Sequence, residues 1–112
     1  MHATALIIFA IAALGGLYLA AHVLRDKFAP WAVSIIHALL GATGLVLLIA
    51  LTVTGGGSPI VTTSLVLFLI AALGGFFLAS FHLRKKLPPK AVVMLHAGLA
   101  VVAFLILLTP LF

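Results

Sequence analysis

The sequence predicts an all-α integral membrane protein, an up-and-down four-helix bundle made of two tandem helical-hairpin repeats. Three observations support this fold class. Hydrophobic residues make up 66% of the 112-residue chain, whereas soluble domains are usually a little under half apolar. Four apolar stretches are each long enough to cross a bilayer, and the second half of the chain repeats the first.

A membrane-spanning helix needs about 20 consecutive apolar residues. The sequence supplies four such spans within a single transmembrane domain of residues 1–112, at approximately 3–24, 30–52, 60–83 and 89–111. The breaks between them read RDKFAP, TGGGSP and RKKLPP, and each ends in proline, which suits the first position of a helix. Connections this short favour antiparallel neighbours. The first span has no basic region before it, so we expect it to be retained rather than removed as a signal peptide.

The internal repeat relates approximately residues 6–53 to residues 65–112. A shift of 59 residues places the AALGG at 12–16 on the AALGG at 71–75, and it also superposes arginines, prolines and histidines. Two hairpins in the same orientation predict a pseudo-twofold axis along the membrane normal. A functional site is then expected close to that axis.

The distribution of charge predicts the orientation. All six basic side chains flank the first or the third loop: Arg25, Lys27, Arg84, Lys85, Lys86 and Lys90. Because basic loops stay in the cytoplasm, we expect a multi-pass protein of a bacterial-type inner membrane with both termini outside. The formal charge of +5 then indicates orientation, and no nucleic-acid partner is expected.

The residue inventory excludes several classes of function. The chain has no cysteine, which rules out Fe–S clusters, thiolate metal sites and a covalently attached c-type haem. Its only acidic side chain, Asp26, lies in a loop. Exporters that couple protons through a membrane-embedded carboxylate are therefore excluded, as are hydrolases with a Ser–His–acid triad.

Two histidines, His37 and His96, are expected at hydrocarbon depth, where an unpaired imidazole is costly. They are related by the 59-residue shift, and each lies seven residues after a proline, about 10 Å from the cytoplasmic interface at 1.5 Å per residue. The twofold predicts that they face each other. Gly41 and Gly44 follow His37 on the same helical face, as small residues follow His96. This pattern suits a planar macrocycle ligated from both sides, with haem b as the candidate.

Two alternatives remain for this pair. Each imidazole could instead bond to a backbone carbonyl, or to the hydroxyl of Ser34 or Thr43, with no cofactor. The four membrane histidines could also bind a bare metal ion, because zinc and copper accept imidazole ligands.

His22 and His82 lie close to Arg25 and Arg84, near headgroup level, and are one position out of register in the repeat. Three roles are open: plain interfacial residues, ligands of a second haem together with His96 or His37, or groups that act with the arginines to hold haem propionates or a quinone head group. His2, alone at the other end, is expected to be exposed and is assigned no role.

Four short-looped spans, a histidine near the same depth on each, and glycines on the same faces resemble the small four-helix transmembrane b-type cytochromes of bacteria. The resemblance implies one or two haem b groups with bis-histidine ligation and electron transfer with quinone or a redox partner protein. By this resemblance, His37 and His96 would be axial ligands, and His22 and His82 would be the candidate ligands of a second haem if two are bound. Because the histidines crowd toward one face, we expect an electron carrier working near the cytoplasmic side rather than a catalyst. The alternative is a non-catalytic structural or assembly subunit, in a homo-oligomer or a larger membrane complex.

Overall fold

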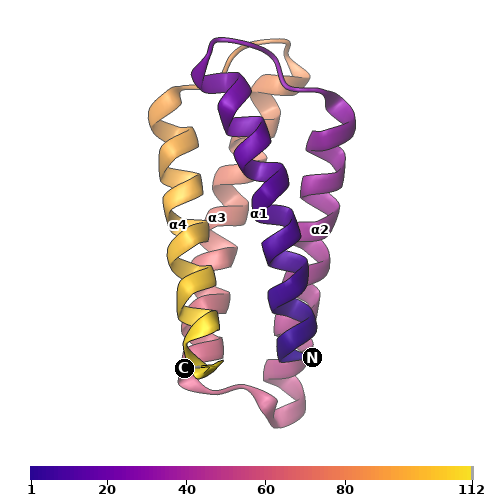
Figure 1. The fold of residues 1–112 in the computed structure, drawn as a ribbon, viewed down its shortest axis with the longest axis vertical. Helices are drawn as coiled ribbons and strands as arrows, with labels where there is room; N and C mark the ends of the chain where they lie inside the picture. The colour runs from indigo at the N-terminus through magenta and orange to yellow at the C-terminus, as the bar shows by residue number, and fades with distance from the viewer. Residues whose placement is uncertain (112) are drawn as a thin grey trace.

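The computed structural model describes residues 1–111 and shows a bundle of four antiparallel helices (Figure 1). They are α1 (His2–Leu24), α2 (Trp31–Leu51), α3 (Pro59–Leu83) and α4 (Lys90–Leu108). A π turn, η1 (Thr52–Gly56), extends α2, and a 3-10 turn, η2 (Thr109–Leu111), extends α4. Each helix is long and apolar enough to cross a membrane, and the bundle is 42 Å long, close to the thickness of a bilayer with its headgroups. The predicted fold class is confirmed.

The two repeats end their first helices in the same way. Asp26 and Lys85, related by the 59-residue shift, both take a left-handed conformation, with φ of 59° and 55°. At both ends an N–H three residues past the helix closes the turn: Lys27 donates to the carbonyl of His22, and Lys86 to that of Phe81, each at 2.9 Å. Such bonds satisfy carbonyls that the helix leaves unpaired. The two basic loops therefore begin with matching geometry.

The other helix boundaries follow from proline, serine and glycine. Pro30 and Pro89 precede α2 and α4 in an extended conformation. Ser58 caps α3 by accepting a hydrogen bond from the N–H of Val61 at 3.2 Å, as serine does at this position. The connection between the repeats turns at Gly55, whose φ of 87° favours glycine.

A stacked aromatic pair lies between the two hairpins. α1 packs mainly on α2, and α3 mainly on α4. The rings of Phe9 and Phe68, again 59 residues apart, stack with centroids 3.9 Å apart and planes 4° apart. Stacking between repeat-equivalent residues is the arrangement that a pseudo-twofold axis through the bundle produces.

The buried core occupies the half of the bundle next to the termini, which we call the closed half (residues 2–12, 44–51, 59–71 and 103–108). Its buried cluster comprises Ala5, Leu6, Phe9, Leu48, Val61, Leu65, Phe68, Ala103 and Leu107. Two polar bonds cross it: Ser64 donates to the carbonyl of Ala103 at 2.7 Å, and His2 Nε2 donates to the carbonyl of Leu107 at 2.8 Å. The expectation that His2 is exposed is wrong, because the half-buried ring joins the start of α1 to the end of α4.

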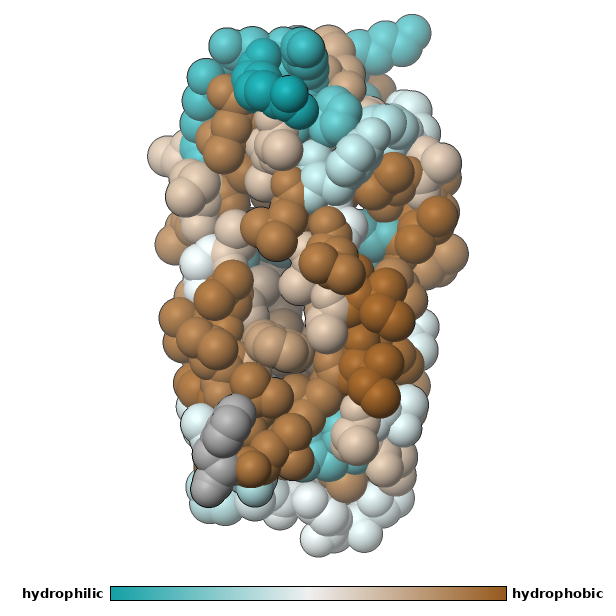
Figure 2. Space-filling model, in the orientation of Figure 1, coloured by the Kyte–Doolittle hydropathy of each residue, from teal (hydrophilic) through white to brown (hydrophobic). Residues whose placement is uncertain are grey.

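The half next to the basic loops is packed differently, and we call it the open half (residues 13–43 and 72–102). Val93 is its only buried residue. Figure 2 shows apolar side chains around the middle of the bundle and hydrophilic ones gathered at the basic end. Both termini lie at the opposite end (Figure 1). The predicted histidine site therefore lies in the part of the bundle with the least internal packing.

Candidate functional site

The structure brings His37 of α2 and His96 of α4 together. Their ring centroids are 6.2 Å apart and their planes are 82° apart. Both side chains are half-buried in the open half. The two histidines thus face each other across the bundle, as the repeat predicts, with their ring planes nearly perpendicular.

Each imidazole is held by a backbone carbonyl of the preceding helix. His37 Nδ1 donates to the carbonyl of Ala12 at 2.8 Å, and His96 Nδ1 donates to the carbonyl of Ala71 at 2.7 Å. These bonds are repeat-equivalent. A carbonyl oxygen can only accept, so in the neutral ring Nδ1 carries the proton and Nε2 holds a lone pair. Within residues 1–111 neither Nε2 makes a hydrogen bond. Metal-ligating histidines are typically oriented by such a bond on the other ring nitrogen.

The carbonyl bond expected for these rings without a cofactor is therefore present, but the hydroxyl partners are not. Ser34 Oγ bonds to His82 Nδ1 at 3.2 Å, and Thr43 donates to the carbonyl of Leu39 in its own helix at 2.8 Å. The polar contacts of His37 and His96 thus use one ring nitrogen each and leave the other available.

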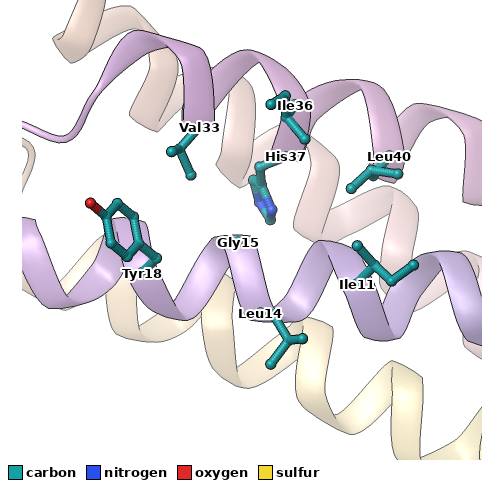
Figure 3. A pocket seen from close by; sticks show the side chains of 8 residues that line it. All are labelled: Ile11, Leu14, Gly15, Tyr18, Val33, Ile36, His37 and Leu40. Carbon is teal, nitrogen blue, oxygen red and sulfur yellow. The ribbon is translucent and has the colours of Figure 1, made fainter.

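The glycine pairs of the repeated AALGG motif make room for the imidazoles. A Cβ added at Gly16 would lie 3.0 Å from His37 Cε1, and one at Gly75 would lie 3.2 Å from His96 Cε1. Figure 3 shows the His37 ring reaching from α2 toward Gly15 of α1. The contact of these glycines with His37 and His96 was not predicted from the sequence, although AALGG and the histidine recur together at the 59-residue shift.

The two glycines predicted beside a macrocycle are placed differently from expectation. Gly41 has no atom within 4 Å of where a Cβ would stand. Gly44 lies against the ring of Phe9, whose Cζ would be 2.6 Å from a Cβ there. Gly44 therefore serves the Phe9–Phe68 stack, and any macrocycle contact at this position requires Phe9 to move.

A groove of about 370 Å³ leads from the outer surface of the α1–α2 hairpin to His37. Tyr18 and His37 are its polar side chains, and the rest of the lining is aliphatic apart from Gly15 (Figure 3). The second repeat has Phe77 where the first has Tyr18. The hydroxyl is therefore specific to the His37 side.

His22 and His82 have different surroundings. His22 Nδ1 bonds to the carbonyl of Tyr18 in its own helix at 2.9 Å. The His82 ring stacks on Trp31, with centroids 3.8 Å apart and planes 9° apart. The His22 ring also lies 4.5 Å from the ring of Tyr18. Each of the two imidazoles thus packs on an aromatic neighbour, Tyr18 or Trp31, rather than on the His37–His96 pair.

Arg25 and Arg84 are exposed at the ends of α1 and α3. Each donates Nε–H to a carbonyl four residues earlier, Ala21 at 2.9 Å and Ser80 at 3.2 Å respectively. Positive charge is favourable at the carboxyl end of a helix, so both arginines stabilise their own helix ends and hold charge at the basic end of the bundle.

Residues 1–111 hold no group of three or more His, Cys, Asp or Glu side chains placed to bind one ion. Comparison of the chain with protein-family models, curated proteins and solved structures finds no match.

Proposed function

We propose that the protein is a membrane haem b protein in which His37 and His96 are the two axial ligands, and that it carries electrons. One observation carries the proposal: two repeat-equivalent imidazoles lie 6.2 Å apart, each fixed through Nδ1 to a carbonyl. This leaves Nε2, the nitrogen that would bind the iron, available on both rings.

The spacing of the rings supports a single metal between them. With metal–nitrogen bonds of about 2 Å, two imidazoles on opposite sides of one ion have centroids about 6 Å apart. The porphyrin supplies four further nitrogens, so two protein ligands complete the coordination of a haem iron. A pair of histidines is therefore a donor set that suits haem.

The packing around the pair supports a cofactor as well. Val93 is the only buried residue of the open half, and the residues beside the imidazoles on α1 and α3 are glycines. The closed half holds the four helices together through its own core. The chain thus fixes the helices at one end and leaves the histidine level thinly packed.

The bound haem would supply one-electron chemistry. The chain's own groups orient the ligands: the carbonyls of Ala12 and Ala71 fix the orientation of the two imidazole rings. If His37 and His96 both hold the haem, the chain offers the iron two nitrogen ligands and a substrate would find no place beside it. Transfer of electrons is therefore favoured over catalysis.

We place the site near the cytoplasmic face of a bacterial-type inner membrane, with both termini outside, because all six Lys and Arg lie at the open end. Arg25 and Arg84 then supply positive charge for the haem propionates. The electron partner is a quinone or a redox protein. We assign one haem rather than two, because His22 and His82 each pack on an aromatic side chain.

The test is the absorption spectrum of the detergent-purified protein, oxidised and dithionite-reduced, with the haem quantified as its pyridine complex. We expect a sharp reduced α-band and one haem b per chain. A folded but colourless protein, even when produced with added haem, would refute the proposal. A ratio of two haems would instead assign ligand roles to His22 and His82.

The carbonyl bonds favour a second candidate function. Bonds from His37 to Ala12 and from His96 to Ala71 join the helices of each hairpin without any cofactor. A structural subunit of a larger membrane complex needs no more than this. Such a subunit would purify colourless and would co-purify with partner chains after mild solubilisation.

A further inference from the structure

The two corners of the bundle at its basic end are equivalent by the repeat but differ in chemistry. At the α1–α4 corner, Lys90 Nζ pairs with Asp26 Oδ1 at 3.1 Å. The residues that correspond to these at the α2–α3 corner are Trp31 and Lys85. An ion pair in one repeat is thus replaced by an aromatic ring and a lysine in the other.

The second corner, which we call the aromatic corner, comprises Phe28, Trp31, Ser34, His82 and Lys85. The His82 ring stacks on Trp31 at 3.8 Å and lies 6.5 Å from the ring of Phe28. Its Nδ1 bonds to Ser34 at 3.2 Å. In the other repeat the positions of Phe28, Ser34 and His82 hold only aliphatic residues: Leu87, Val93 and Val23. The aromatic corner therefore has aromatic and polar side chains that the equivalent positions of the other corner lack.

A cavity of about 240 Å³ opens at this corner, lined by Phe28, Ala29, Trp31, His82 and Lys85. The only acidic side chain of the protein, Asp26, is paired with Lys90 at the other corner. When Ser34 donates its hydroxyl proton to His82 Nδ1, Nε2 carries the ring proton and becomes a second donor beside the Lys85 ammonium. The cavity thus combines an apolar aromatic wall with two donors, one of them cationic, and has no acidic side chain in its lining.

We propose that the aromatic corner binds the phosphate group of an anionic amphiphile. Lys85 Nζ and His82 Nε2 donate to the phosphate oxygens, and the adjoining apolar part lies against Trp31 and Phe28. Basic pockets between membrane helices are suited to anionic headgroups. A neutral ligand would gain little from the lysine charge. This inference does not depend on haem binding.

Trp31 is the only tryptophan in the chain, so its fluorescence reports directly on the cavity. The experiment titrates the purified protein, in neutral detergent and at fixed haem content, with short-chain phosphatidylglycerol. Phosphatidylcholine and glycerol phosphate are titrated in parallel. We expect a saturable change in Trp31 emission with phosphatidylglycerol and a much weaker one with the zwitterionic lipid. Saturation by glycerol phosphate as well would identify a soluble phosphate as a ligand, whereas a response to phosphatidylglycerol alone would identify a lipid.

Matched variants separate a site from general attraction to positive charge. Lys85→Gln should weaken phosphatidylglycerol binding about tenfold, the loss expected for one charge-assisted hydrogen bond. Lys86→Gln removes the same charge from the same loop but lies outside the cavity, and should change binding less than about twofold. His82→Phe retains a ring on Trp31 but removes the donor, and should weaken binding as well.

Two results would overturn the proposal. The first is the absence of any saturable Trp31 response to phosphatidylglycerol and to glycerol phosphate. The second is an equal loss of affinity in Lys85→Gln and Lys86→Gln, which would indicate diffuse electrostatic attraction. Neither result bears on the haem proposal, which is judged by absorbance.

Discussion

The closed and open halves of the bundle are built from the same four helices, yet only one of them has a core. Leu48 and Leu107 of the closed half are 0% exposed, whereas the repeat-equivalent pair Leu40 and Leu99 in the open half is half-buried. All four residues are leucine, so the difference in their exposure comes from position along the bundle rather than from residue type. The closed half joins the four helices through its core, and at its border the carbonyls of Ala12 and Ala71 hold the imidazoles of His37 and His96.

Removing either histidine of the proposed ligand pair should have the largest effect. We expect His37→Leu and His96→Leu to lose haem absorbance completely, because one remaining imidazole leaves the iron with an apolar side chain opposite. The buried cluster of the closed half does not include either histidine, so circular dichroism should still report a helical bundle. His22→Leu is the control and should retain the haem. Retention of a full haem complement in His96→Leu would contradict the assignment.

Truncating a leucine should destabilise the protein more in the closed half than in the open half. Leu107→Ala should lower the free energy of unfolding in detergent by about 1–3 kcal/mol, because it leaves a cavity that the closed half cannot fill. Leu99→Ala in the open half should lower it by less than about 1 kcal/mol. Equal effects on the unfolding curves of the two variants would show that the halves are packed alike.

Adding one methyl group beside His37 should weaken the site without removing a ligand. The new Cβ in Gly16→Ala would stand 3.0 Å from His37 Cε1, and overpacking of this kind costs about 1–3 kcal/mol. We expect haem affinity to fall about tenfold, measured by transfer of haem to an acceptor protein. Gly41→Ala, which has open space around it, should bind haem like the wild type. A change in Gly41→Ala as large as that in Gly16→Ala would contradict the role given to the glycine pair.

The smallest expected effect is in the closed half. Ser64 bonds to the carbonyl of Ala103, and its repeat equivalent is Ala5. Ser64→Ala makes the two repeats alike and should cost about 0.6 kcal/mol, the average for side-chain hydrogen bonds between membrane helices. Haem content should not change. A loss of haem in this variant would mean that the two halves are coupled more tightly than their packing indicates.

The sequence predicted the elements and the histidine pair because both depend on local or repeated features. Apolar length and proline placed the helices, and the 59-residue repeat placed His37 opposite His96. The sequence could not predict which helix lies against each histidine. Counting along α2 put Gly41 and Gly44 beside the cofactor, whereas Gly16 of α1 is the glycine that touches the ring.

The same limit explains the other differences. Spacing within a helix defines its faces, but the axial offset between neighbouring helices depends on how their side chains interlock. That offset brings Phe9 onto Gly44 and pairs Ser34 with His82 rather than with His37. It also sets His2 against Leu107. Each of these contacts joins residues of different helices, and none is repeated in the other half of the chain at the level of sequence.

The most direct test of the central claim is electron paramagnetic resonance of the oxidised protein at low temperature. The ring planes of His37 and His96 are 82° apart, and if these two imidazoles hold the haem as proposed, the ferric form should give a strongly anisotropic low-spin signal. That result would show that His37 and His96 bind the iron with their ring planes nearly perpendicular, as they are in the fold. A high-spin signal, or the rhombic low-spin signal of parallel imidazoles, would contradict it.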